Sequence, residues 1–324
     1  MQSPSYLKLL ASGELRRRSE QLLGRLQPCE VCPRHCRVKR MDDMKAICRT
    51  GRYAEVASHC LHHGEEPCIS GERGSGTVFF AHCNLECLFC QNHQISQEWA
   101  DGQGAASPRR LAGIYLELER QGAHNLNWVS PSHVVPQAVE ALVLAAERGF
   151  RLPVVYNSNG YDDLDTLRLL DGIVDIYMPD MKYCDESAAS ELSKAVGYAS
   201  NAQAAIIEMW RQVGPLALDE EGIARRGLLV RHLVLPGGLS QTREVLGFLS
   251  NSLGKGAAVS LMAQYFPASG AASHPLLRRP LAAEEWERAL DALDASGIEE
   301  GFVQELSASA NYRPDFNKQG HPFE

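Results

Sequence analysis

The stretch GSGTVFFAHCNLECLFCQN, residues 74–92, joins a short apolar run to a cluster of three cysteines. The run TVFFAH, residues 77–82, predicts a buried β-strand, because it is short, apolar and rich in β-branched and aromatic residues. Cys83, Cys87 and Cys90 follow directly, with the spacing C-x3-C-x2-C. The sequence therefore predicts a strand whose carboxyl end leads into a loop that carries three thiols.

Downstream of this strand, short apolar runs alternate with helical patterns. Further strands are expected near 125–130, 153–158, 173–178, 228–235 and 257–264. Helical patterns lie near 107–121, 136–148, 162–170, 199–213, 241–252 and 282–296. This alternation predicts right-handed crossovers and a parallel sheet with helices outside. Six units are fewer than the eight of a complete barrel. The expected fold class is therefore α/β, a partial (β/α)6 TIM-type barrel with a Cys-rich N-terminal extension, and a doubly wound sheet is the alternative.

The segments outside this rhythm suggest a three-part organisation. Residues 5–26 are predicted to form one amphipathic helix, and residues 27–75 are predicted to be irregular. Residues 214–227 interrupt the alternation as an extended loop or hairpin. We therefore expect a basic Cys-rich metal-binding extension over 1–75, a barrel domain over 76–306 and a polar tail over 307–324.

Composition and charge exclude several classes of protein. The 324 residues are 44% hydrophobic and 22% charged, which predicts a sizeable core and excludes wholesale disorder. The net charge of −8 disfavours polyanion binding by the whole surface. Residues 1–52, however, hold 12 Lys and Arg against 5 Asp and Glu, a balance of +7 that leaves −15 on the rest. No membrane span or secretory signal is recognised, so we expect a cytoplasmic protein without a membrane partner.

Seven of the ten cysteines fall into two clusters, which in a cytoplasmic chain suggests metal binding rather than disulfides. The triplet offers three thiolates, whereas a [4Fe–4S] cluster normally takes four. One iron would then stay open to a substrate or cofactor. A zinc site is the alternative, with His82 or His93 as the candidate fourth ligand.

Cys29, Cys32, Cys36 and Cys48 form the second cluster. Four thiolates saturate either a tetrahedral zinc ion or a [4Fe–4S] cluster, and the spacing does not choose between them. The surrounding Lys and Arg residues would neutralise an anionic cluster, or would let a zinc knuckle contact nucleic acid. We expect an auxiliary [4Fe–4S] cluster or zinc here, and we consider nucleic acid an unlikely partner because the body of the chain is acidic.

The triplet in its context resembles the radical S-adenosylmethionine (SAM) superfamily. The run 64–96, GEEPCISGERGSGTVFFAHCNLECLFCQNHQIS, is similar to the pyruvate formate-lyase activating enzyme-like branch. Further similar segments are NLNWVSPSHVVP (125–136), VVYNSNGY (154–161), DIYMPDMKY (175–183) and RHLVLPGG (231–238). The resemblance implies that SAM binds the open iron, and that one electron cleaves it to a 5′-deoxyadenosyl radical that abstracts a hydrogen atom.

The expected function is therefore that of a radical SAM oxidoreductase acting on an unidentified substrate, with a peptide or protein as a candidate. An activase for a glycyl-radical enzyme is the alternative, and a zinc-stabilised nucleic-acid-binding protein is a third, less favoured one. By class, the resemblance also implies an electron donor such as flavodoxin or ferredoxin. The basic N-terminal arm is a candidate docking face for such an acidic carrier.

The resemblance also assigns cofactor contacts at the ends of the second and third strands. Ser130 and Ser132 stand where the family often has Gly-Gly-Glu, so a hydroxyl or carbonyl would replace the carboxylate that contacts the methionine amino group. Ser132 as a helix N-cap is the structural alternative. Asn157, Ser158 and Asn159 stand where the activases have Asp-Thr-Asn. Asn157 removes an anionic ligand and puts the family's monovalent cation site in doubt.

Later strand ends add charged candidates. Asp180 and Lys182 match the family's Asp-Leu-Lys motif, which helps to place the methionine carboxylate. Arg231 resembles a basic residue of the fifth strand near the cofactor, with a surface salt bridge as the alternative. Lys182 and Cys184 are also candidate catalytic groups. Cys184 could be a hydrogen-atom donor, or only a buried thiol.

Overall fold

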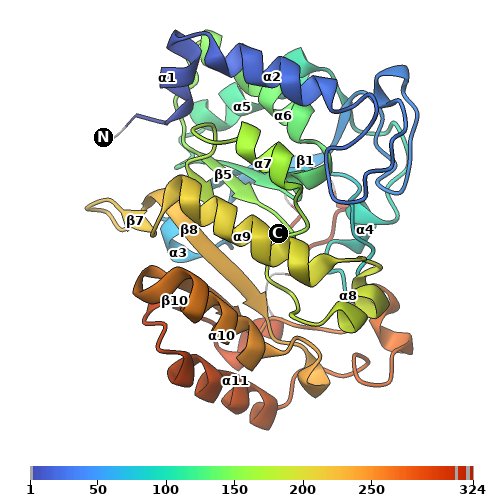
Figure 1. The fold of residues 1–324 in the computed structure, drawn as a ribbon, viewed down its shortest axis with the longest axis vertical. Coiled ribbons are helices and arrows are strands. Elements are labelled where there is room, and N and C mark those ends of the chain that lie inside the picture. Colours follow the sequence, from blue (N-terminus) through green and yellow to red (C-terminus); the bar gives the residue numbers. More distant parts are fainter. Residues whose placement is uncertain (1–2, 311–312, 319–321, 324) are drawn as a thin grey trace.

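The computed structural model describes residues 3–310, 313–318 and 322–323, and its architecture is α/β (Figure 1). A mixed ten-stranded sheet has the order β10-β9-β8-β6-β5-β4-β2-β1-β3, and β7 pairs with β8 beside this path. The strands are β1 (Ala54–His62), β2 (Ser75–Phe80), β3 (Ala105–Ala106), β4 (Leu126–Val129), β5 (Val154–Asn157), β6 (Ile176–Tyr177), β7 (Ala217–Leu218), β8 (Ala224–Leu233), β9 (Ala258–Met262) and β10 (Glu300–Val303).

All six predicted strands are confirmed, as β2, β4, β5, β6, β8 and β9, and every neighbouring pair among them is parallel. The predicted irregularity of residues 27–75 is wrong in part, because β1 pairs antiparallel with β2 from Val56↔Phe80 to His62↔Ser75. Its sequence AEVASHCLH mixes polar and apolar residues, and most of its residues are only half-buried. β10 was also missed, since this edge strand, parallel to β9, exposes most of its residues.

The helices flank this sheet. They are α1 (Tyr6–Ala11), α2 (Glu14–Gly24), α3 (Pro67–Ser70), α4 (His93–Ser96), α5 (Pro108–Arg120), α6 (Val135–Glu147), α7 (Leu164–Leu169), α8 (Glu186–Ser193), α9 (Tyr198–Val213), α10 (Thr242–Leu253) and α11 (Ala283–Ser296). The six predicted crossover helices are confirmed, and α8 was missed. The single helix predicted over 5–26 is wrong, because Gly13 adopts φ 78° and separates α1 from α2. The hairpin predicted over 214–227 is confirmed by the β7–β8 pair.

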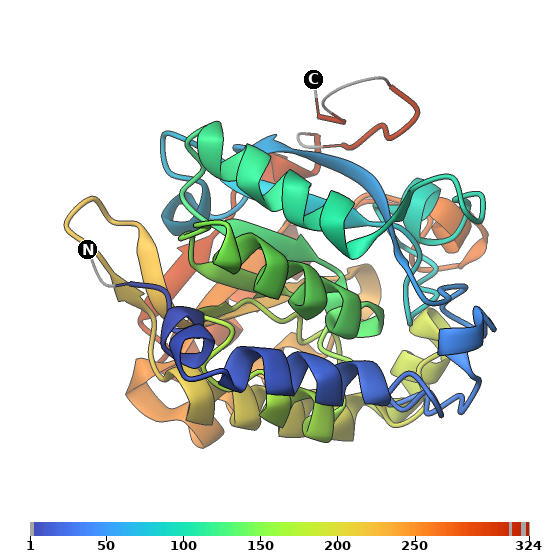
Figure 2. The same ribbon diagram turned by 90° about the horizontal axis from the view of Figure 1, so that it is seen from above.

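The N-terminal helices pack on the body rather than projecting from it. Figure 2 shows α2, α6 and α5 side by side on one face of the molecule. Leu15 and Leu22 of α2 are fully buried, and the Tyr6 hydroxyl donates to the carbonyl of Phe150 at 3.2 Å. No helix within the described residues is long and apolar enough to cross a membrane.

Several positive charges of the basic arm, residues 1–52, are paired within the molecule. Five of its cations form ion pairs with carboxylates of the acidic body: Arg16–Glu147, Arg25–Asp163, Lys45–Asp101, Arg49–Asp101 and Arg52–Glu140. The exposed pairs among them contribute little stability each, and all five join the arm to the body. The opposite charges of arm and body therefore have an intramolecular explanation.

Candidate functional site

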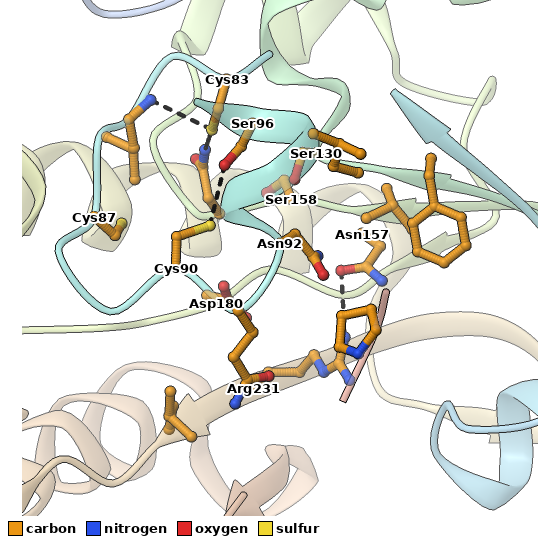
Figure 3. A pocket seen from close by; sticks show the side chains of 18 of the residues that line it. Cys83, Cys87, Cys90, Asn92, Ser96, Ser130, Asn157, Ser158, Asp180 and Arg231 are labelled. Atoms are coloured by element: carbon orange, nitrogen blue, oxygen red, sulfur yellow. Dashed lines mark hydrogen bonds between the residues drawn. The ribbon is translucent and has the colours of Figure 1, made fainter. Parts of the chain in front are cut away.

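A cavity of about 210 Å³ opens where the parallel strands end (Figure 3). Its wall holds residues that directly follow β2, β4, β5 and β6, together with Arg231 near the end of β8. The cavity brings together ten of the predicted site residues: Cys83, Cys87, Cys90, Ser130, Asn157, Ser158, Asn159, Asp180, Lys182 and Arg231. Residues up to 148 positions apart in the sequence thus share one wall, because parallel strands deliver their carboxyl ends to the same edge.

Each sulfur of the triplet has a polar neighbour. Cys83 Sγ accepts from the Leu85 backbone N–H at 3.4 Å and from Asn159 Nδ2 at 3.3 Å. Cys87 Sγ accepts from the Ser193 hydroxyl at 3.0 Å, and Cys90 Sγ lies 3.2 Å from Ser96 Oγ. Such contacts around thiolates tune and orient metal ligands.

Burial sets the protonation of these thiols in the free protein. It raises the pKa of Cys83 to about 12 and that of Cys90 to about 11, and it also raises the pKa of Cys87. The neighbouring sulfurs raise the pKa values of Cys83 and Cys90 further, because two thiolates repel each other. Three clustered thiolates therefore require a cation to hold them, which is what a metal centre supplies.

No three His, Cys, Asp or Glu side chains in the described part of the chain are arranged to hold a metal ion already. Metal sites commonly close only when the ion binds, because the ligands must also lose their protons. Of the two candidate zinc ligands, His82 lines the cavity and its Nε2 lies 3.5 Å from Glu55 Oε1. His93 is absent from the described cavity wall, and its Nδ1 pairs with Glu98 Oε1 at 2.9 Å.

Asp180 and Lys182 form an ion pair in the cavity wall. Burial lowers the pKa of Lys182, but the charges of Asp180 and Cys87 outweigh this effect and raise its pKa above the ordinary value. Gly160 allows the Asp180 backbone to approach, since a Cβ on Gly160 would lie 2.1 Å from the Asp180 carbonyl oxygen. The Asn-Gly and Asp-Met-Lys segments are thus held against each other.

Arg231 is paired inside the cavity rather than on the surface. Its Nη2 lies 3.1 Å from Glu65 Oε2, and its Nε lies 3.0 Å from Glu66 Oε1. Glu65 Oε1 also accepts from Asn157 Nδ2 at 3.2 Å and from Asn127 Nδ2 at 3.0 Å. Burial lowers the pKa of Arg231, yet the two carboxylates raise it overall. The surface-salt-bridge alternative for Arg231 is therefore wrong.

Glu65 is a residue of the cavity wall that was not predicted as a site residue from the sequence. It lines the cavity and brings a carboxylate to Asn157 at the end of β5. The run Gly-Glu-Glu-Pro was its only signal, and its position in the loop after β1 could not be derived because β1 was not predicted. Ser193, 106 residues from Cys87, gave no signal at all.

Two predicted residues lie outside the described cavity wall. Ser132 is buried in the 3-10 turn Pro131–His133, and it does not cap α6, whose N-cap residue is Val134. Cys184 lies at the far side of the Asp180–Lys182 segment, where its Sγ is 4.0 Å from Gln203 Nε2 and its backbone N–H donates to Gln241 Oε1. Burial raises the pKa of Cys184 to about 11, which suits the buried-thiol alternative.

The four N-terminal cysteines form a separate group outside the described cavity wall. Burial raises the pKa of Cys32, and the charges of Cys48, Cys29 and Cys36 raise it further. Arg34 links this group to the triplet loop. Its Nε donates to the carbonyl of Asn84 at 2.8 Å, and Asn84 is the residue after Cys83.

Comparison with known proteins finds similarity to an archaeal protein. The chain is 30% identical to "Uncharacterized protein MJ0674" of Methanocaldococcus jannaschii over 277 residues, which are 84% of this chain and 75% of the archaeal protein. This chain belongs to the MJ0674 family. No family model matches the sequence. The name of MJ0674 assigns no activity, so the function of the family has to be inferred from the site itself.

Proposed function

We propose that this member of the MJ0674 family is a radical SAM iron–sulfur enzyme that cleaves SAM reductively and abstracts a hydrogen atom from its substrate. The observation that carries the proposal is the convergence of Cys83, Cys87 and Cys90 on one cavity together with the polar ends of four other strands. Three thiols facing open space suit a cluster with one iron left for a ligand. The finer fold that goes with this proposal is a partial (β/α)6 barrel with the Cys-rich segment as an extension.

The donor set fits the proposed [4Fe–4S] cluster. Three thiols supply one ligand to each of three irons, and donors from Leu85, Asn159 and Ser193 would stabilise the thiolates. When bound, the cluster would supply the electron that splits SAM into methionine and a 5′-deoxyadenosyl radical.

The residues of the chain would orient SAM and exclude water. Lys182 is held as a cation by Asp180 and can bind the methionine carboxylate. Glu65, oriented by Asn127 and Asn157, offers the carboxylate that the second strand end lacks and can accept from the methionine amino group. Arg231 pairs with Glu65 and holds its carboxylate in place. Phe79, Phe89 and Ile95 supply the apolar wall that limits water around the reacting groups.

The test is anaerobic reconstitution of the whole chain with iron and sulfide, followed by electron paramagnetic resonance of the reduced protein. The proposal expects a brown protein whose cluster signal changes when SAM is added, because SAM would become a ligand of the open iron. A cluster signal that SAM leaves unchanged, or a colourless chain that takes up only zinc, would contradict it. The substrate is proposed to be a peptide, a protein or a small molecule, and a low-potential carrier such as flavodoxin or ferredoxin is the proposed electron source.

A further inference from the structure

The loop that carries Cys29, Cys32, Cys36 and Cys48 is compact and mostly buried. Three of these cysteines are buried and Cys36 is half-buried. The Cys29 backbone N–H donates to the Val38 carbonyl at 2.9 Å, and the Arg37 N–H donates to the Cys29 carbonyl at 2.9 Å. These two bonds close the segment that holds Cys32 and Cys36.

The backbone turns sharply after two of these cysteines. Arg37 follows Cys36 and adopts φ 57°, and Arg49 follows Cys48 and adopts φ 50°. Residues other than glycine rarely adopt this left-handed conformation, and each such residue costs conformational energy. The loop therefore accepts strain at two points that directly follow cysteines.

The buried side chain of Arg40 is a second observation, independent of the backbone geometry of the loop. Its side chain is 1% exposed, and no carboxylate of the described residues lies within ion-pair distance of it. Its Nη1 donates to the His133 carbonyl at 2.8 Å and faces Cys29 Sγ at 3.8 Å. Its Nη2 is buried without a hydrogen-bond partner among the residues described. A guanidinium is almost never buried without a compensating anion, so this cation lacks its counter-charge.

A metal centre held by four thiolates supplies that charge. Four thiolates around Zn²⁺ carry about two net negative charges, and so do four thiolates around an oxidised [4Fe–4S] cluster. We propose that Cys29, Cys32, Cys36 and Cys48 bind a closed, dianionic metal–thiolate centre, with the buried Arg40 as its counter-ion. The sulfurs draw together when the centre is loaded, because metal binding and local folding are coupled at such sites.

This proposal does not depend on SAM chemistry, and its experiment separates the two. The full chain with Cys83, Cys87 and Cys90 replaced by alanine has no triplet ligands. We expect it to retain about one zinc ion, or about four irons with sulfide, per chain when each metal is offered separately and counted by mass spectrometry. The metal that survives competition with a chelator identifies the native centre. Further replacement of Cys29 and Cys32 by alanine should remove the retained metal.

The same triplet-free chain tests the role of Arg40. Arg40→Met should lower the metal affinity about 10- to 100-fold in chelator competition, because an outer-shell partner of the ligands is lost. Arg37→Met is the matched control, since this arginine lies in the same loop but is exposed and paired with Glu30. The metal affinity of this variant should not change. Far-ultraviolet circular dichroism reports whether each variant is folded.

Stoichiometric metal in the triplet-free chain together with a selective effect of Arg40→Met supports the proposal. A triplet-free, folded chain that retains neither metal contradicts it, and so does equal metal affinity of the two arginine variants. The metal count of the chain with Arg40 intact decides the matter even if Arg40→Met does not fold.

Discussion

The two cysteine groups of this chain occupy opposite environments. The triplet borders a cavity whose wall carries polar side chains from several strand ends, whereas the described wall of that cavity includes none of the four N-terminal cysteines. The triplet sulfurs accept hydrogen bonds from neutral donors such as Asn159 and Ser193, and the charge of Lys182 acts on Cys87, while Cys29 faces the buried cation Arg40. Three ligands beside open space suit chemistry, and four ligands beside a fixed charge suit a saturated centre. The number of ligands and their surroundings, rather than the cysteines themselves, distinguish the two groups.

The two groups nevertheless meet. Arg34 leaves the N-terminal loop and donates to the carbonyl of Asn84, and its guanidinium carbon lies 5.8 Å from the centre of the Tyr161 ring. Asn84 in turn donates to the Tyr161 carbonyl and accepts from Asn159, which also contacts Cys83. A short set of hydrogen bonds therefore connects the two loops.

The largest expected effect is the loss of SAM cleavage when the cysteine triplet is removed. Replacing Cys83, Cys87 and Cys90 by alanine should abolish the formation of 5′-deoxyadenosine from SAM, since no thiolate remains to hold the reactive cluster. Chromatography of the reaction mixture measures the product. Cys68→Ala, which removes a buried thiol outside both groups, is the control and should retain activity. Product formation by the triple variant would remove the distinction drawn here.

The next largest effect concerns the charges of the cavity. Arg231→Met should lower the free energy of unfolding by about 3–5 kcal/mol, because it leaves Glu65 and Glu66 buried without their cation. Urea unfolding measures this loss. Adding Glu65→Gln and Glu66→Gln to Arg231→Met should restore part of the stability. A loss below 1 kcal/mol would show that the two carboxylates do not depend on Arg231.

Close packing in the cavity wall should give a smaller effect. Gly160→Ala should destabilise the protein by roughly 2–4 kcal/mol, because its Cβ would meet the Asp180 carbonyl and its φ is 80°. Gly254→Ala is the matched control, since Gly254 has φ 68° but open space around it, and it should lose only about 1–2 kcal/mol. Equal losses in urea unfolding would mean that the contact with Asp180 does not matter.

The smallest expected effect is a pH dependence of the free energy of unfolding that arises from the buried His232. Burial lowers the pKa of His232 to about 4, from an ordinary value of 6.5, while its Nδ1 lies 2.7 Å from the Met181 carbonyl oxygen. Between about pH 4 and pH 6.5, His232 is therefore protonated in the unfolded chain and neutral in the folded chain. The stability that neutral His232 contributes to the folded protein is fully present above pH 6.5. It falls by about 1.4 kcal/mol per pH unit as the pH drops from 6.5 toward 4.

Urea unfolding at pH 7 and pH 5 measures this dependence. His232→Asn should make the difference between the two pH values smaller, and His35→Asn, which removes an exposed histidine, is the control. An unchanged difference in His232→Asn would show that His232 does not account for the loss of stability in acid.

The sequence predicted the parallel centre of the sheet because each of its strands is an apolar run bounded by turn residues. It missed β1, since Ser58, His59 and His62 break the apolar pattern, and pairing with β2 rather than composition makes this segment a strand. The cavity residues at strand ends were predictable from topology. Glu65 and the Ser193–Cys87 contact were not, because they depend on how distant loops pack.

The same limit applies to the N-terminal arm. Its basic excess suggested an external acidic partner, and the sequence did not reveal that ion pairs such as Arg25–Asp163 and Arg52–Glu140 also join the arm to the body of the chain. Sequence spacing also suggested that the four cysteines act together, whereas the buried position of Arg40 beside Cys29 required the folded structure.

The most direct test of the central claim is to mix the reconstituted, reduced chain with SAM under anaerobic conditions and to quantify 5′-deoxyadenosine and methionine. The account predicts that both products form in equal amounts, and that neither forms without reductant. A fully loaded, reduced iron–sulfur protein that leaves SAM intact would contradict it.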